Sequence, residues 1–360
     1  MTGLPPAGRG RLELPPVEPA AVLEQVATGP YPWPTASATG LGSMPGTDPD
    51  AVARLVLDEL PDLPFLPELP GRGAPSDLAG RTAALLAELT VDLQPSGWRI
   101  TPRSSIDGIR ARDALSRDLD ALELAAAAAP PGQVKVQAAG PWTLAALLEL
   151  NRGERVLADH GAVRDLAASL GEGLARHVEE VARRVPGATV VLQLDEPSLP
   201  AVLAARIRTS SGVATLRAPQ PQLAAEHLRT VLAAAERTVV HCCAAHPPVD
   251  LLHAAGAGAV SLDATLLTPA DDDALGEALS DGLGLLLGVV AATDRPLPPV
   301  DDTLLPVRRL WSRLGLAPGL LPQAVVLTPT CGLAGASPRY AAAALAHCVR
   351  AATALGREPQ

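Results

Sequence analysis

The sequence is poor in aromatic residues, at 2%, and among its 360 residues Lys135 is the only lysine. It has no basic run and no alternation of basic with aromatic residues, the pattern with which proteins bind nucleic acids. The formal net charge is −10. We therefore expect no nucleic-acid partner. Alanine, arginine and proline are abundant, and we interpret the scarcity of lysine as part of this compositional bias, with little meaning for function.

The sequence also lacks long apolar runs. No segment approaches the roughly 18 to 20 uninterrupted apolar residues that a membrane-spanning helix needs. Residues 1–30 carry charges and prolines where a secretory signal would need an apolar stretch. We therefore expect a cytoplasmic protein without a membrane partner. Four cysteines are too few for a disulfide framework, so their positions matter more than their number.

Hydrophobic residues make up 48% of the chain, enough for a large core. Residues 1–30 are Pro-rich and aperiodic, which predicts a disordered arm. Over residues 31–360, short β-type runs alternate with long amphipathic Ala/Leu-rich stretches, and a helix is expected to start at Asp48-Pro49. The expected strands cover residues 37–43, 91–94, 133–138, 189–195, 238–243, 259–263, 284–290 and 324–329.

Eight strands alternating with helices are compatible with a closed barrel or an open doubly wound sheet. The number of strands and the polar residues at the strand ends favour the barrel, whose catalytic groups lie on the C-terminal rim. We therefore predict one α/β domain over residues 31–360, a single (β/α)8 TIM barrel. The irregular residues 206–219 form either a rim loop or a short extra strand.

A His-x-Cys pattern ends the fifth expected strand. Because side chains alternate along a strand, His241 and Cys243 should point to one side and Cys242 to the other. Imidazole and thiolate are preferred zinc ligands. The alternative is core packing, because free cysteine is among the most often buried residues. We assign that role to Cys242 and to Cys348, which lies in an Ala-rich helix.

Two further strand ends could complete a metal site. Asp263 ends the sixth expected strand with a carboxylate, and Cys331 follows the last strand with a second thiol. In a barrel these ends converge on one cavity although they lie far apart in the sequence. The residues alone leave metal binding and core packing equally open.

Five motifs, spanning about residues 37 to 340, resemble in the same order those of the catalytic, C-terminal half of the cobalamin-independent methionine synthase family. The family belongs to a superfamily with uroporphyrinogen decarboxylase. The motifs are Thr39–Pro45, Val136–Pro141, Leu192–Leu199, Val239–Cys243 and Thr330–Leu333.

The resemblance implies a zinc (Zn2+) site whose ligands would be His241, Cys243, Asp263 and Cys331. Asp195 would bind the amino group of the substrate, and Ser43 would help to hold its carboxylate. Two protein thiolates would keep the metal electron-rich, so a bound substrate thiolate would stay reactive toward a methyl group.

The sequence departs from the family pattern at several positions. Asp263 is one methylene shorter than the family's glutamate ligand, and Thr293 stands where the family has a catalytic histidine. Residues 92–98 lack the family's amine-binding glutamate. The N-terminal half of the long synthases, with part of their folate-binding surface, has no counterpart here.

These features predict a zinc-dependent methyltransferase whose acceptor is a small-molecule thiol, with homocysteine giving methionine as the leading choice. The methyl donor would be a folate or a corrinoid protein. Two alternatives remain: a catalytically impaired paralogue that binds zinc or a ligand, and a metal-free enzyme like uroporphyrinogen decarboxylase. A dinucleotide-binding loop at residues 40–46 is disfavoured because its third glycine is misplaced.

Overall fold

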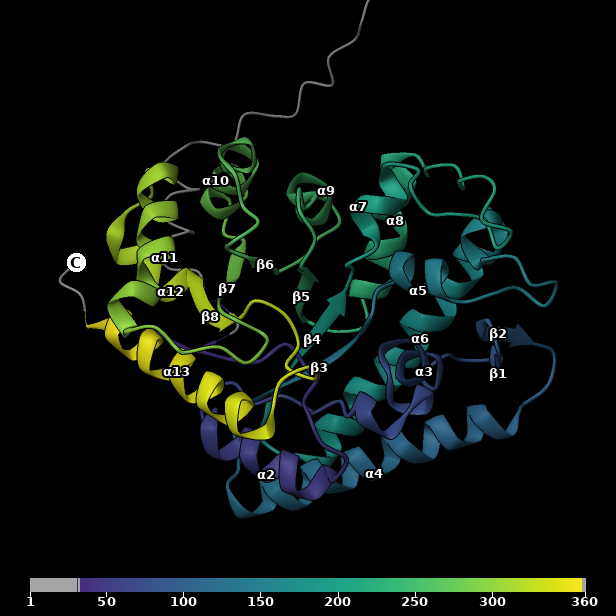
Figure 1. Ribbon diagram of the computed structural model, residues 1–360, viewed down its shortest axis with the longest axis horizontal. Helices are drawn as coiled ribbons and strands as arrows, with labels where there is room; N and C mark the ends of the chain where they lie inside the picture. The colour runs from purple at the N-terminus through teal and green to yellow at the C-terminus, as the bar shows by residue number, and fades with distance from the viewer. Residues whose placement is uncertain (1–30, 32, 358–360) are drawn as a thin grey trace, which may run out of the picture.

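The computed structural model describes residue 31 and residues 33–357. The predicted arm, residues 1–30, lies outside this range, and its disorder stays a prediction. Six strands form a curled, open parallel sheet that is surrounded by helices (Figure 1). The strands are β3 (Gln133–Ala139), β4 (Thr189–Asp195), β5 (Arg237–Cys242), β6 (Ala259–Asp263), β7 (Gly284–Val290) and β8 (Val325–Pro329).

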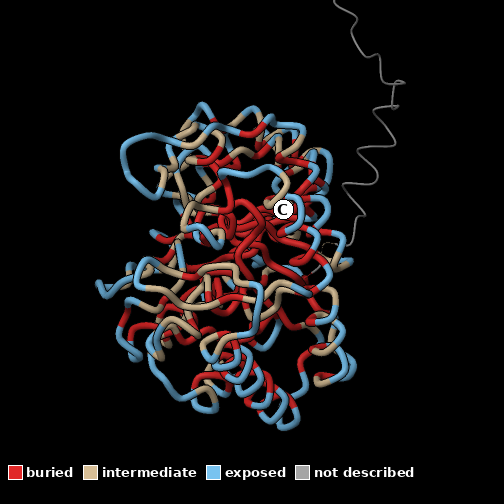
Figure 2. Tube along the Cα trace, turned by 90° about the vertical axis from the view of Figure 1, so that its right-hand side faces the viewer, coloured by how far each residue is buried: buried red, intermediate tan, exposed pale blue. Residues whose placement is uncertain are grey.

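Each strand of this sheet pairs in parallel with the next strand of the chain. The expected strands from residue 133 onward are thereby confirmed to within one residue at either end. Their apolar runs are buried on both faces, as is usual for a parallel sheet covered by crossover helices. Buried segments accordingly gather at the centre of the molecule, and exposed segments lie at its edge (Figure 2).

The helices are α2 (Pro49–Glu59), α3 (Leu78–Ala83), α4 (Ile106–Ala128), α5 (Pro141–Leu147), α6 (His160–Arg184), α7 (Leu199–Leu203), α8 (Pro221–Leu232), α9 (Val249–Ala254), α10 (Asp272–Ser280), α11 (Val300–Leu314), α12 (Leu321–Ala324) and α13 (Pro338–Gly356). The start of α2 is as expected, because the Asp48 carboxylate accepts hydrogen bonds from the backbone of Asp50 and Ala51. Among the described residues, no helix is long and apolar enough to cross a membrane.

The prediction of a closed eight-stranded barrel is wrong. Two irregular segments cover the open side of the six-stranded sheet, and they make only isolated bridges. We call them the first closing segment, residues 37–44, and the second closing segment, residues 63–68. Ala38 bridges to Leu327 of β8, Phe65 bridges to Lys135 of β3, and Ser43 bridges to Glu68 between the two segments.

Proline explains why the second closing segment does not form a longer strand. Pro64 and Pro67 have no backbone N–H to donate, so a continuous ladder with β3 cannot form. Hydrogen bonds remain where a donor exists: Lys135 donates to the Pro64 carbonyl, and Leu66 donates to the Lys135 carbonyl, each at 2.8 Å.

The strand expected at residues 91–94 exists but lies outside the sheet. There β1 (Thr90–Gln94) pairs antiparallel with β2 (Gly97–Thr101) in a hairpin turned by Pro95 and Ser96. Its assignment to the barrel was wrong because strand propensity does not specify the pairing partner. Residues 206–219 form a loop with one isolated bridge, between Arg208 and Thr215.

The concave side of the sheet is layered. Its lowest layer is an apolar cluster of Trp33, Leu63, Val191, Val239, Ala259, Leu286 and Val326. The next residues on the same face are polar and buried, among them Gln193, Ser261 and Thr328. Because side chains on one face recur every second residue, this order places polar groups directly below the C-terminal rim.

Candidate functional site

A histidine and two cysteines meet at the C-terminal end of the sheet. His241 lies near the end of β5, Cys243 directly follows β5, and Cys331 begins the loop after β8. Their ligand atoms all lie within 4.8 Å of one another. Cys242 is fully buried in the core cluster on the outer side of the sheet, as strand alternation predicts. The arrangement provides one nitrogen and two sulfur ligands for a metal ion.

Hydrogen bonding orients the His241 ring. Its Nδ1 atom lies 3.0 Å from Ser261 Oγ and 3.2 Å from the Ser261 carbonyl oxygen on the neighbouring strand β6. In the tautomer with the proton on Nδ1, the ring donates to that carbonyl, and Nε2 is left free as a ligand atom. Metal-binding histidines are commonly fixed by such a contact at the second ring nitrogen.

The two thiols strongly affect each other. Contacts with Cys243, whose sulfur lies 3.5 Å away, and with His241 lower the pKa of Cys331 to about 4. The contact with Cys331 and burial raise the pKa of Cys243 well above its usual range. Without a cation, a second thiolate this close is therefore unfavourable. A divalent ion would allow both sulfurs to ionise, and this donor set suits zinc.

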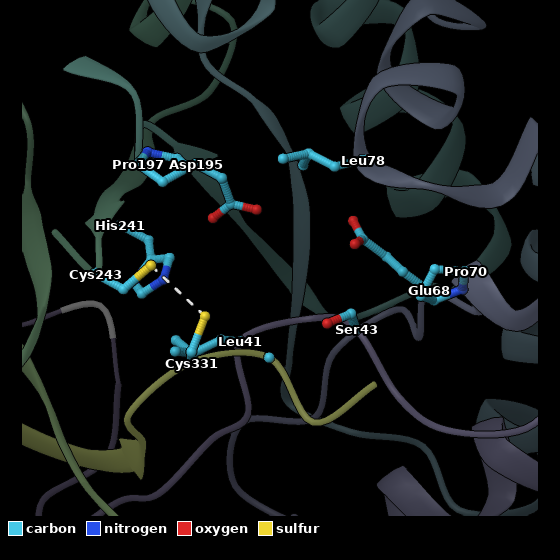
Figure 3. Close-up of a pocket in the computed structure, with 11 residues that line it drawn as sticks. Leu41, Ser43, Glu68, Pro70, Leu78, Asp195, Pro197, His241, Cys243 and Cys331 are labelled. Carbon is cyan, nitrogen blue, oxygen red and sulfur yellow. Dashed lines mark hydrogen bonds between the residues drawn. The ribbon is translucent and has the colours of Figure 1, made fainter. Parts of the chain in front are cut away.

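The same residues line a cavity of about 210 Å³ (Figure 3). Its wall consists of Leu41, Ser43, Glu68, Pro70, Leu78, Asp195, Pro197, His241, Cys243, Cys331 and Gly332. The predicted site residues Ser43 and Asp195 thus lie in one cavity with the histidine and the two cysteines, although they come from four distant parts of the chain.

Asp263 is placed differently. Its carboxylate accepts hydrogen bonds from the backbone N–H and the hydroxyl of Thr265, at 2.8 and 2.7 Å. It lines a second cavity, of about 440 Å³, together with Thr293, Arg295 and Tyr340. Over residues 33–357, the group close enough to hold a metal consists of the histidine and the two cysteines without Asp263.

Glu68 is a site residue that the sequence analysis missed. It ends the second closing segment, is buried, and points its carboxylate across the cavity toward that of Asp195 (Figure 3). The sequence predicts the second barrel strand at residues 91–94, so the family's amine-binding glutamate is expected within residues 92–98, which lack one. A glutamate inside the apolar, Pro-rich run of residues 63–70 was the signal available in the sequence.

Burial dominates the electrostatics of the two carboxyl groups. It raises the pKa of Glu68 to about 7, against the opposing effect of Arg81, whose Nε lies 3.7 Å from Glu68 Oε1. It raises the pKa of Asp195 to about 6, partly offset by His241 and by a 2.7 Å hydrogen bond from Gln193. Both groups would ionise more readily with a cation between them, so this end of the cavity suits a ligand's ammonium group.

The turn after β4 is tied down by Glu196, which is fully buried. Its carboxylate accepts hydrogen bonds from the backbone N–H groups of Trp142 and Thr143, at 2.9 and 2.8 Å, and from the Thr143 hydroxyl. Its own N–H donates to the His241 carbonyl at 2.7 Å. Glu196 therefore fixes the end of β4 against both the start of α5 and β5.

Gly332 allows the Cys331 loop to approach the first closing segment. A Cβ atom at Gly332 would lie 1.9 Å from Ser43 Oγ, a distance no side chain can adopt. The next residue, Leu333, donates its N–H to the Ser43 carbonyl at 2.7 Å. The position of Cys331 thus depends on a glycine at residue 332.

The sequence model described as "Cobalamin-independent synthase, Catalytic domain" matches residues 125–354. Among solved structures, a B12-independent methionine synthase from Shewanella sp. W3-18-1, in complex with selenomethionine, superposes with a TM-score of 0.59 at 11% identity. The alignment covers 90% of this chain and 98% of that chain. At this identity the similarity supports the fold alone.

A 2,3-dimethylmalate lyase of the PEP mutase/isocitrate lyase superfamily reaches a TM-score of 0.38 at 13% identity, over 91% of this chain and 85% of its own. No curated protein matches the sequence.

Proposed function

The chain belongs to the cobalamin-independent methionine synthase catalytic-domain family, a family of methyltransferases, and from this we propose that it is a zinc-dependent enzyme that methylates the thiol of homocysteine. The observation that carries the proposal is the two-ended cavity. One end has a metal-binding histidine and two cysteines, and the other has the buried carboxylates of Glu68 and Asp195. A thiol amino acid carries the complementary groups, a sulfur and an ammonium, at its two ends.

Zinc fits the residues present. One imidazole and two thiolates form a known catalytic set, in which the fourth position is left for water or substrate. Cys331 is exposed on the cavity wall, so the site is accessible to a substrate sulfur. Bound there, the metal would lower the pKa of the substrate thiol and favour the nucleophilic thiolate.

Asp263 is kept as a proposed ligand of the substrate-free site, as the resemblance implies, and a substrate sulfur would then replace its carboxylate. To reach a metal, its carboxylate would have to give up both hydrogen bonds from Thr265. Loss of zinc from Asp263→Ala but not from Thr265→Ala would support ligation. Full zinc retention in Asp263→Ala would remove Asp263 from the ligand set.

The protein side chains would hold the substrate in one orientation. Glu68 and Asp195 accept hydrogen bonds from its ammonium group, and Ser43 Oγ, which also lines the cavity, donates one to its carboxylate. Leu41 and Leu78 line the apolar part of the cavity. This arrangement directs the substrate sulfur toward the two cysteines. The substrate is thereby bound in an orientation that is close to the reactive geometry.

Family membership implies a methylated folate as the donor, and no observation supports a corrinoid partner. Thr293 is exposed in the 440 Å³ cavity at the position where the family has its histidine. A threonine hydroxyl cannot supply a proton at neutral pH, and a tertiary methylamine needs one to leave. We therefore propose that 5-methyltetrahydrofolate is a slow donor and that a donor with a better leaving group, such as a sulfonium compound, reacts faster.

Thr293 also favours a second candidate, a paralogue that binds zinc and an amino acid without turnover. The deciding experiment combines elemental analysis of protein purified without chelators with a methionine assay on the zinc-loaded protein and homocysteine. Zinc with turnover supports the enzyme, and zinc without turnover on any donor supports the binding protein. A protein that never takes up zinc would contradict both and favour a metal-free decarboxylase-like enzyme.

A further inference from the structure

The only lysine of the chain is buried inside the curled sheet. Lys135 lies in the middle of β3, and its side chain is fully buried. Its backbone makes the two hydrogen bonds that attach the second closing segment to β3, so it stands next to the segment that carries Glu68. An unpaired buried lysine is costly, which calls for an explanation in the surrounding charges.

The ammonium group faces the concave interior. Lys135 shares its face of β3 with Gln137, whose amide donates to the Leu66 carbonyl of the second closing segment at 2.6 Å. The Nζ atom lies 5.4 Å from the centre of the Phe65 ring and has no hydrogen-bond acceptor within the described part of the chain. The interaction of this charge with its surroundings is therefore electrostatic rather than a direct ion pair.

The acidic side chains around the cavity have few cationic partners. Asp118 of α4 pairs with Arg72, at 2.7 Å, and with Arg81 of α3, and Arg81 also lies near Glu68. These four groups sum to zero. Asp195 and Glu196 are left; hydrogen bonds from the start of α5 hold Glu196, and Lys135 is the lysine whose charge acts on Asp195. Accordingly, its charge lowers the pKa of both cavity carboxyls.

We propose that Lys135 is a positioning residue, the counter-ion beneath Glu68 and Asp195 that favours the charged form of Glu68 and so prepares the cavity for a substrate ammonium group. The inference rests on the proposed function. It implies that the enzyme selects thiols that bear an amino group, through a residue that never touches them.

Removal of the lysine should act through Glu68. The charged groups that face Glu68 are Arg81 from α3, Lys135 from β3 and Asp195 from β4. With Lys135 neutral, uptake of a proton by Glu68 relieves the excess negative charge. A protonated carboxyl is a weaker acceptor for an ammonium group, so binding of the amino acid weakens.

The test measures methionine binding by calorimetry, because methionine has the ammonium and carboxylate groups without an ionisable thiol. Lys135→Met should weaken binding on the order of tenfold. Its melting temperature should fall, because the buried carboxylates lose their counter-charge. Zinc content should not change.

Val134→Ala is the matched control. Val134 is the preceding residue of β3, fully buried in the core cluster on the outer side of the sheet. This variant should lower the melting temperature and leave the affinity for methionine unchanged. A Lys135→Met variant that behaves like Val134→Ala would show a packing role and overturn the proposal.

A second measurement needs no variant. Because the chain has one lysine, protein labelled with ε-¹³C-lysine gives one side-chain NMR signal. Methionine should shift that signal, and 4-(methylthio)butyrate, which lacks only the amino group, should shift it much less. Equal shifts, or none with saturating methionine, would overturn the inference. If the wild-type protein does not bind methionine at all, the proposed function fails as well.

Discussion

The sulfur atoms of Cys243 and Cys331 lie 3.5 Å apart although 88 positions separate the two residues in the chain. A zinc ion there should need both. Cys243→Ser and Cys331→Ser should each lose most of the roughly one zinc per chain, because a hydroxyl is not ionised near neutral pH and serves poorly as a ligand. Cys242→Ser, on the outer side of the sheet, should retain it. Elemental analysis measures the zinc content of the three proteins. Equal losses of zinc in all three would contradict the predicted alternation of side chains along β5.

Glu68→Gln should weaken methionine binding on the order of tenfold, because the ammonium group loses one of its two charged acceptors. The matched control is Glu149→Gln. Glu149 is also buried, but it pairs with Arg99 of the β1–β2 hairpin at 2.7 Å, outside the cavity. That variant should lose stability and keep its affinity. Calorimetry and thermal melts on both proteins measure the two effects, and equal affinities for wild type and Glu68→Gln would remove Glu68 from the site.

The apoprotein should lose stability as the pH rises from about 5 to 7.5. Burial raises the pKa of Glu196 from 4.5 to about 7, so in this window the native state binds more protons than the unfolded state. Stability therefore falls with pH, by at most about 3 kcal/mol for this one group. Burial of Glu68 acts in the same direction.

The pH effect can be assigned with Glu196→Gln, which has no proton to release. Urea unfolding at pH 5.5 and 7.5, with a chelator present, should give a smaller difference between the two pH values for the variant than for the wild type. The same slope in both proteins would show that Glu196 does not titrate in this range.

Gly332→Ala should displace the Cys331 loop, because the added methyl group would lie 1.9 Å from Ser43 Oγ. We expect weaker zinc binding and a lower melting temperature. Ser43→Ala in the same protein removes that oxygen, and the nearest remaining Ser43 atom is Cβ at 3.2 Å. The double variant should therefore recover part of the zinc affinity measured in a competition titration. No recovery would place the strain elsewhere.

Thr293→His should accelerate methyl transfer from 5-methyltetrahydrofolate by about a hundredfold, the lower range for a positioned general acid. The side chain at residue 293 lines the cavity next to the carboxyl ends of β6 and β7, where a donor could reach it. Methionine formation by the zinc-loaded protein is the assay, with Thr293→Ala as the control. Rapid turnover by the wild type with methylfolate alone would disprove the slow-donor proposal.

Local sequence patterns were sufficient for the six-stranded part of the fold and for the candidate histidine and cysteines of the site. The strands from residue 133 onward are apolar runs bounded by turn residues, and each pairs with the next along the chain. The placement of His241 and Cys243 on one face required only the alternation of side chains in a strand. The convergence of Asp195 and Cys331 followed from the common direction of parallel strands, whereas Ser43 was assigned to the site through the family resemblance alone.

Only the tertiary structure decided what closes the sheet and what fills it. Residues 90–94 have high strand propensity, but they pair with the neighbouring strand β2 in a hairpin. The Pro-rich residues 63–68 have low strand propensity, and yet they lie beside β3. Which segment pairs with the sheet depends on hydrogen bonds between backbone groups that are distant in the sequence. The periodicity of a short segment does not encode these partners. For the same reason Glu68 and Lys135 were recognised only through their neighbours: the role of a buried charge is set by the charges around it, which the fold brings together.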